Sequence, residues 1–284
     1  TRTSSSAASD VYKRQSGVIS GDTALTKAGS GQLTTSANNT YTGGTTVSAG
    51  TLFGGAGSRT NDVFGTGSIS VASGATLWVD RSDDGALTNA LTLNGGTLYG
   101  TNGFGQYWDG NITLGAHSTI NAANNFYIDG VISGSSKNLT KTGTGTVILR
   151  GTNTYSGTTT VSAGTLNIGG SGSLGSGTYA GNISNSGTFT YASSTAQTLS
   201  GVISGPGALT KSGSSTLTLS GTNTYSGDTT ISAGAITVSG LLGNGSYAGG
   251  IANSGTLTLS SSSAQTLSGC LLYTSDAADD DVRV

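Results

Sequence analysis

The chain has 284 residues, of which 49 are glycine and 8% are charged, with a formal net charge of −2 at pH 7. The charge is close to zero and no basic patch is visible, which argues against a nucleic-acid-binding protein. Disordered chains normally combine low hydrophobicity with high net charge or abundant proline. Only one proline is present here, so the composition favours stacked strands over disorder.

The two ends of the chain are expected to be non-native. Residues 5–15 and 270–280 can be encoded by the two strands of one DNA oligomer, which resembles a transposase adaptor used in sequencing libraries. Such scars are excluded from fold reasoning. We therefore predict adaptor-derived ends at residues 1–15 and 270–284, and a natural segment at residues 16–269 that is cut at both ends. The single cysteine falls in the second end, so the natural segment has no disulfide.

Internal repeats organise the natural segment. Three nearly identical copies begin with Gly-Val-Ile-Ser-Gly, and they are Gly17–Leu52, Gly130–Leu166 and Gly201–Ile236. A second unit occurs at Ser173–Gly201 and Leu241–Gly269, and the two units together form a super-repeat of about 70 residues, the separation of Lys141 and Lys211. A divergent stretch, Phe53–Asp129, separates the first two copies and holds both tryptophans.

Each repeat is expected to form short strands. Apolar residues alternate with hydroxyl residues in Thr216–Ser220, which is the period of a half-buried strand. The Ala-Gly pair within Thr46–Leu52 marks a tight turn between two strands. No helical stripe is visible, so stacking of copy on copy is the simplest way to bury the aliphatic residues. At roughly 20 residues per coil, the segment makes about 12 coils and a rod on the order of 60 Å long.

The repeat positions also predict which side chains face inward. Six leucines are expected in the core: Leu33, Leu52, Leu139, Leu166, Leu217 and Leu219. One repeat position holds Asn39, Asn153 and Asn223, and another holds Tyr41, Tyr155 and Tyr225. If the copies stack in register, these residues form an amide ladder and an aromatic ladder. The alternative is that they are exposed turn residues that form no ladder.

These residues resemble the autotransporter passenger-associated repeat, whose pattern is L-T-K-x-G-x-G-x-L-x-L-x-G-x-N-T-Y-S-G-x-T-T-V-S-A-G-T-L. The pattern covers Leu139–Leu166 and Leu209–Ile236, and in weaker form Leu25–Leu52. The resemblance implies an all-β fold, a right-handed single-stranded parallel β-helix. It also implies export through an outer-membrane β-barrel made by the C-terminus of the same polypeptide, which is absent from residues 16–269.

The resemblance further implies a function and a location. The chain is expected to be a structural stalk that aids its own export across the outer membrane of a Gram-negative bacterium. At the cell surface it would present or act as an adhesin, with a host or environmental glycan or protein as its partner.

We expect no enzymatic activity, no catalytic residue, no cofactor and no metal. General acid–base and nucleophilic catalysis draw on His, Cys, Glu or Asp placed together, and the one histidine, His117, has no Ser-His-Asp pattern around it. The alternative is a polysaccharide-active β-helix enzyme that uses Asp80, Asp83 and Asp84. These three carboxylates could instead bind Ca²⁺, and a solvated loop is the simpler interpretation.

A glycan contact is a further hypothesis, at Tyr107, Trp108 and Asp109. Aromatic side chains beside carboxylates form sugar-binding platforms, and Phe126 and Tyr127 follow later in the chain. The alternative is that these rings pack inside the solenoid.

Overall fold

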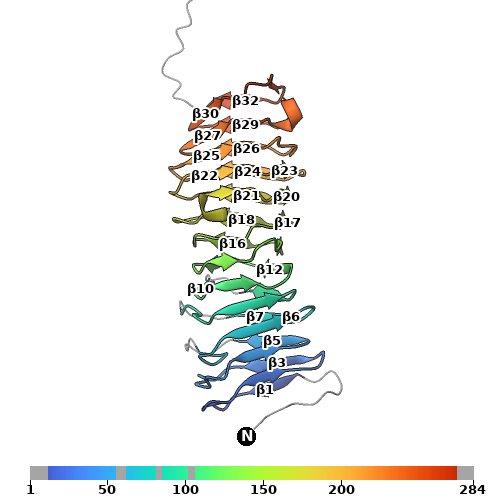
Figure 1. The fold of residues 1–284 in the computed structure, drawn as a ribbon, viewed down its shortest axis with the longest axis vertical. Coiled ribbons are helices and arrows are strands. Elements are labelled where there is room, and N and C mark those ends of the chain that lie inside the picture. The colour runs from blue at the N-terminus through green and yellow to red at the C-terminus, as the bar shows by residue number, and fades with distance from the viewer. Residues whose placement is uncertain (1–11, 56–61, 81–84, 102–105, 274–284) are drawn as a thin grey trace, which may run out of the picture.

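A computed structural model describes residues 12–55, 62–80, 85–101 and 106–273. They form a rod of short strands whose chain ascends from the N-terminal end to the C-terminal end, coil upon coil (Figure 1). About 12 coils are stacked in this way, and each coil contributes one segment to each of three faces that run along the rod. This confirms the predicted parallel β-helix, while its right-handed winding stays a prediction.

Face 1 consists of a ten-stranded sheet followed by a two-stranded sheet. Its strands are β1 (Lys13–Gln15), β3 (Gln32–Thr35), β5 (Thr51–Gly54), β7 (Thr76–Val79), β9 (Thr97–Gly100), β12 (Ser118–Ala122), β15 (Leu139–Thr142), β17 (Thr159–Val161), β20 (Ile183–Asn185), β23 (Ile203–Ser204), β28 (Ser246–Tyr247) and β31 (Thr266–Leu267). Residues 223–225 join the two sheets, because Thr224 N–H donates to Ile203 O and Asn223 N–H to Leu241 O.

Face 2 consists of a nine-stranded sheet. Its strands are β10 (Gln106–Trp108), β13 (Phe126–Ile128), β16 (Thr146–Leu149), β18 (Thr165–Ile168), β21 (Thr188–Tyr191), β24 (Ala208–Lys211), β26 (Thr229–Ile231), β29 (Ile251–Asn253) and β32 (Leu271–Tyr273). Irregular segments extend the face toward the N-terminus. Leu87 N–H donates to Tyr107 O, and Asn39 N–H donates to Asp62 O.

Face 3 consists of a six-stranded sheet followed by a five-stranded sheet. Its strands are β2 (Leu25–Lys27), β4 (Thr45–Val47), β6 (Ile69–Ala72), β8 (Leu91–Asn94), β11 (Ile112–Leu114), β14 (Ile132–Ser133), β19 (Thr178–Tyr179), β22 (Gln197–Leu199), β25 (Thr216–Leu219), β27 (Ala235–Val238) and β30 (Thr256–Leu259). Residues 153–155 join the two sheets through Thr154 N–H to Ile132 O and Asn153 N–H to Ser173 O. Short 3₁₀ turns, η1 (Gly175–Gly177) and η2 (Gly243–Gly245), precede β19 and β28.

The alternation seen in the sequence places one side of most strands in a continuous core, while β1, β30 and β31 near the two ends have no buried residue. Neighbouring strands pair in parallel and in register, so that Leu52, Leu77 and Leu98 lie above one another in β5, β7 and β9. Five of the six leucines predicted to face inward are buried, and Leu33 is partly buried against the core. Because each coil covers the apolar residues of the next, the coils stabilise one another only through nearest neighbours.

The three copies of the repeat do not lie directly above one another. From β15, successive coils pair Leu139 with Thr159, Thr159 with Ile183, and Ile183 with Ile203, which is 20, 24 and 20 residues per coil. The next strand, β24, contains Leu209, the equivalent of Leu139, but it lies on face 2 and not on face 1. The super-repeat of 70 residues therefore covers three coils and one further face.

The predicted asparagine and tyrosine ladders are consequently wrong. The Asn-Thr-Tyr segment of the first copy lies on face 2, that of the second on face 3 and that of the third on face 1, because neither the 114 residues from Asn39 to Asn153 nor the 70 from Asn153 to Asn223 make a whole number of coils. Within each copy the tyrosine packs elsewhere. Tyr155 meets Tyr179 with ring centroids 5.7 Å apart, and Tyr225 meets Tyr247 at 5.3 Å.

Strands β1 and β32 lie in the two ends that we predict to be adaptor-derived. The edge strands at the ends of a solenoid present unpaired backbone groups, to which an extended segment of almost any sequence can add. β1 pairs with β3 and β32 pairs with β29 in this way. The pairing therefore does not test the origin of these residues, which stays a prediction.

Candidate functional site

The predicted glycan-contact residues occupy β10 and the position just after it. The Trp108 side chain is 0% exposed and lies in the core column between Leu87 and Ile128. Its indole therefore forms no part of the surface. Tyr107 points outward and is half-buried, and Asp109 is exposed. The structure thus separates the three residues, and an outward-facing site at this position rests on Tyr107 and Asp109 alone.

Two stacked rings and an arginine surround Tyr107 on the outer side of face 2. Tyr127, its partner in β13, lies with its ring centroid 4.7 Å away at an interplanar angle of 10°. The guanidinium of Arg150 lies 5.3 Å from the Tyr107 ring centroid and 5.0 Å from that of Tyr127. Arg150 also forms two hydrogen bonds of 2.5 Å to the Asp129 carboxylate. We call Tyr107, Asp109, Tyr127, Asp129 and Arg150 the face 2 cluster.

The electrostatics of the face 2 cluster follow from this stacking. Partial burial and the nearby Asp129 carboxylate raise the pKa of Asp109, and Arg150 opposes them. The hydrogen bonds that Arg150 donates to Asp129 raise the pKa of Arg150 above its already high value. The guanidinium therefore stays charged and fixed against both rings. Such a cluster can hold a ligand by apolar contact and hydrogen bonds.

A second set of polar residues, which the sequence did not single out, lies inside the solenoid. The lysine of each Leu-Thr-Lys motif points into the core, and Lys27, Lys141 and Lys211 are 4%, 1% and 0% exposed. The Nζ of Lys141 donates to Gly143 O and Gly145 O at 2.6 Å and to Ala163 O at 3.0 Å. Lys27 and Lys211 bind carbonyl oxygens of the equivalent turns. Each ammonium therefore joins the corners of two successive coils.

The Ser-Ala-Gly turn of the motif supplies part of this carbonyl cage. Gly164 has φ +63°, and a Cβ atom there would lie 2.4 Å from Gly145 O and 2.7 Å from Lys141 Nζ. An L-residue with a side chain is strained in that backbone region and would also displace the ammonium. The glycine and the lysine of the motif are therefore parts of one corner.

We expect the buried lysines to make the rod more stable as pH rises from 7 to 10. Burial lowers the pKa of Lys141 from 10.5 to about 8. Between these two pH values Lys141 is neutral in the folded chain and protonated in the unfolded chain, so unfolding takes up a proton. Stability then increases with pH by roughly 2 kcal/mol for this lysine. Urea titrations at pH 7 and pH 10 measure the gain, and Lys141→Met should reduce it.

The gain should reverse above pH 10. Burial raises the pKa of Tyr41 and of Tyr179 from 10.0 to about 12, so folded tyrosines hold protons that the unfolded chain loses, and stability falls between these values. An unchanged pH dependence in Lys141→Met would contradict the assignment of the gain to Lys141. Lys27 and Lys211, whose pKa values burial also lowers, would still give the variant part of the rise.

The Asn-Thr-Tyr segment also forms a buried hydrogen-bond network. The Oδ1 of Asn153 accepts from Ile132 N at 2.9 Å, and its Nδ2 donates to Gly151 O at 2.8 Å. The Tyr155 hydroxyl lies 2.8 Å from Thr159 Oγ1, which lies 2.7 Å from the Tyr179 hydroxyl. Asn223 and Tyr225 make the same contacts in the third copy. These side chains therefore satisfy buried polar groups where a regular strand is missing.

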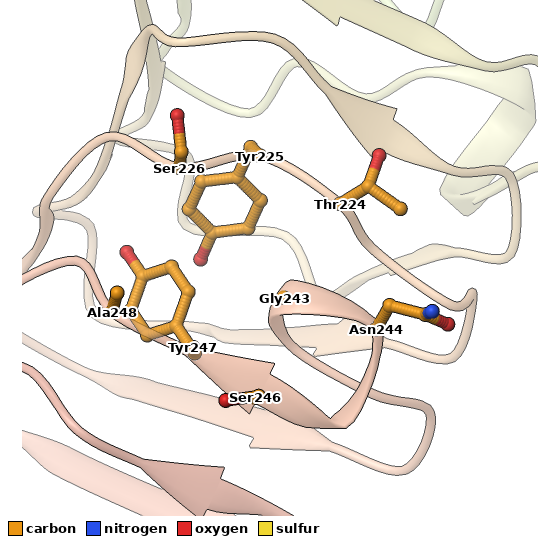
Figure 2. Close-up of a pocket in the computed structure, with 8 residues that line it drawn as sticks. All are labelled: Thr224, Tyr225, Ser226, Gly243, Asn244, Ser246, Tyr247 and Ala248. Carbon is orange, nitrogen blue, oxygen red and sulfur yellow. The ribbon is translucent and has the colours of Figure 1, made fainter.

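A cavity of about 290 Å³ lies beside this hydrogen-bond network in the third copy, between residues 224–226 and 243–248. Figure 2 shows the rings of Tyr225 and Tyr247 next to each other on one side, and Asn244 on the other. Both phenol hydroxyls are already bonded, to Thr229 and, for Tyr247, also to Gly227 O. The lining residues carry hydroxyl, amide and apolar groups, so the cavity contains no carboxylate, imidazole or thiol that could act as an acid or base.

The other residues considered for chemistry are not brought together by the described part of the chain. Asp80 follows β7, while Asp83 and Asp84 lie outside the described residues, so neither the enzyme hypothesis nor the Ca²⁺ hypothesis is tested there. His117 is exposed in the turn before β12, and its Nδ1 accepts a hydrogen bond of 3.0 Å from Asn138 N. In the described ranges, no three His, Cys, Asp or Glu residues are grouped in a way that could hold a metal ion.

The geometry defines a class of protein, a parallel β-solenoid in which buried, repeated polar side chains form hydrogen bonds to the turns between its faces. Comparison with known proteins then gives the family. The passenger-associated-transport-repeat family matches residues 25–52, 139–168 and 209–238. A relative, an adhesin BmaC autotransporter of Brucella suis biovar 1 (strain 1330), is 37% identical over 145 residues, which is 50% of this chain and 4% of the relative. The chain therefore carries the passenger-associated transport repeat of autotransporters at these residues, as the sequence motif predicted.

No solved structure matches the chain. Within residues 12–273, apart from the undescribed gaps, no helix has the length and apolar character needed to cross a membrane. The chain spans about 4% of the length of the curated relative that it matches.

Proposed function

We propose that the chain is part of the stalk of a secreted autotransporter passenger on the surface of a Gram-negative bacterium. In this proposal the stalk aids its own export through a β-barrel made by the same polypeptide, and it presents or forms an adhesive surface. The passenger repeats and the adhesin relative point to a non-enzymatic role. The partner would be a glycan or a protein on a host or environmental surface.

One observation carries the export part of the proposal, namely that each coil pairs only with the coils next to it. The register of β15, β17, β20 and β23 is continuous from coil to coil. A coil that emerges from a pore can therefore dock on the coil before it without waiting for distant parts of the chain. Burial of its apolar residues then opposes backward movement of the chain.

Surface display of the segment tests this mechanism. Residues 16–269 would be fused between a signal peptide and an autotransporter β-barrel in a Gram-negative host, and antibody binding and protease cleavage on intact cells would be measured. Val161→Asp, which places a charge in the core, should reduce display several-fold, because the coils cannot stack. Thr160→Asp, its outward-facing neighbour in β17, is the matched control and should be displayed normally. Equal display of the two variants would contradict export driven by coil stacking.

The adhesive part of the proposal has a candidate surface in the face 2 cluster. Its stacked rings and fixed guanidinium are half-buried, and the Asp109 and Asp129 carboxylates are exposed. Tyr107→Ala and Asp109→Ala in the purified chain should weaken binding on a glycan array without changing far-UV circular dichroism. Binding that both variants retain in full would remove this cluster from the proposal.

A further inference from the structure

The outward-facing aromatic side chains of the natural segment gather in the divergent stretch. In the repeat copies the described tyrosines, such as Tyr41, Tyr155 and Tyr225, are buried. In the divergent stretch Phe53, Trp78 and Tyr99 point outward from β5, β7 and β9, where they are half-buried. We propose that this strip of face 1 binds a neutral polysaccharide chain that lies along the rod axis. The inference deepens the proposed adhesive function by naming a site and a ligand class.

The three rings form a continuous apolar strip. They occupy one register column, Phe53 beside Trp78 and Trp78 beside Tyr99. Their centroids are 4.4 Å and 5.4 Å apart, with interplanar angles of 38° and 29°. The indole N–H donates to Thr101 Oγ1 at 2.7 Å, which fixes the orientation of the central ring. A ligand therefore meets a surface that is already ordered, and it loses less entropy on binding.

A column of hydroxyl groups runs beside the aromatic strip. Thr51, Thr76 and Thr97 lie two residues before the rings in the same strands, and they are paired with one another in register. Strands in a solenoid repeat about every 4.8 Å, so the rings and the hydroxyls form two parallel columns along the axis with that spacing. A pyranose ring has an apolar face of C–H groups and a rim of hydroxyls, and both find partners on this surface.

The charge of the surface decides between classes of polysaccharide. From β3 to β15, the outward positions of the face 1 strands carry threonine, glutamine, asparagine or aromatic side chains. An anionic polysaccharide would find no lysine or arginine at these strand positions to pair with its carboxylates or sulfates. A neutral polymer has no charge to desolvate there.

Tryptophan emission offers a direct measurement, because the chain has two tryptophans and Trp108 is fully buried. The whole chain would be titrated with soluble neutral glucans and galactans and with a polyuronate. We expect a neutral polysaccharide to change Trp78 emission, and the polyuronate to have no effect. The double variant Trp78→Thr/Tyr99→Thr should raise the Kd at least tenfold by isothermal titration calorimetry. Threonine suits this column, since Thr34 and Thr142 occupy it in β3 and β15.

A matched variant on the other face separates this inference from the proposed function. Tyr107→Thr/Tyr127→Thr removes the stacked pair of the face 2 cluster, so a change in the Kd of this variant reports on the surface named in the proposed function and not on the face 1 strip. If no neutral polysaccharide binds, or if the face 1 variant binds as tightly as the original chain, the inference is overturned. Binding lost only in the face 2 variant would overturn the face 1 site and leave the proposed adhesive function standing. Far-UV circular dichroism would check that both variants are folded.

Discussion

Replacing Leu219 by aspartate is expected to lower the free energy of unfolding by at least about 4 kcal/mol. Leu219 is 0% exposed and lies in the core column with Leu199 and Val238. The substitution removes a buried aliphatic side chain, which costs about 2–5 kcal/mol, and adds a carboxylate that must be buried without a partner or protonated. Urea unfolding followed by far-UV circular dichroism measures the loss.

The neighbouring residue supplies the control for this prediction. Thr218 lies between two inward leucines and faces outward in β25, so Thr218→Asp places the same charge in solvent. We expect that variant to lose less than about 1 kcal/mol, as is usual for surface substitutions. Similar losses in the two variants would show that the inward and outward assignments of β25 are wrong.

The second large effect is expected at Trp108, whose replacement by alanine should cost about 3–5 kcal/mol. Its side chain fills the core between Leu87 and Ile128, and alanine there would leave a cavity between these two neighbours. The indole Nε1 is buried without a hydrogen-bond partner among the described residues, so its N–H contributes no compensating bond. Far-UV circular dichroism in urea measures the change, because tryptophan emission is itself altered by the substitution.

Trp108→Phe separates the lost volume from the lost ring. Phenylalanine retains an aromatic side chain in the column and removes an N–H that has no partner among the described residues, so we expect a markedly smaller loss than for alanine. If alanine at this position were as stable as tryptophan, the burial of Trp108 would be contradicted, and a surface role for the indole would return.

The sequence predicted the architecture well because its signals are local. Alternation in segments such as Thr216–Ser220 and the near-identity of the copies were enough to predict parallel coils, and the inward leucines follow from the same alternation. The repeat motif predicted the passenger-associated transport repeat whose family model matches three segments of the chain. None of these inferences needed to know which face of the rod a given strand occupies.

The features that the sequence did not predict all depend on which face of the rod, and which neighbouring coil, each segment meets. Sequence similarity suggested that Asn153 lies above Asn39, but contacts between coils are set by the number of residues per coil, which varies from 19 between Val147 and Leu166 to 25 between Thr51 and Thr76. The inward lysines were missed because Lys141 reads as an ordinary surface residue until the carbonyl oxygens of the next coil are in place. Tyr107 and Trp108 were both predicted to contact glycan, although adjacent residues of a strand face opposite sides, and only Tyr107 lies on the outer side.

The offset between repeats couples the length of the rod to its orientation. Because one 70-residue unit advances the chain by three coils and one further face, each unit raises whatever follows by roughly 16 Å and swings it about 120° around the long axis. Tandem arrays change length by gaining or losing whole units. The gain of one repeat unit would therefore rotate every binding surface beyond it around the rod axis, and only a change of three units would restore the original orientation.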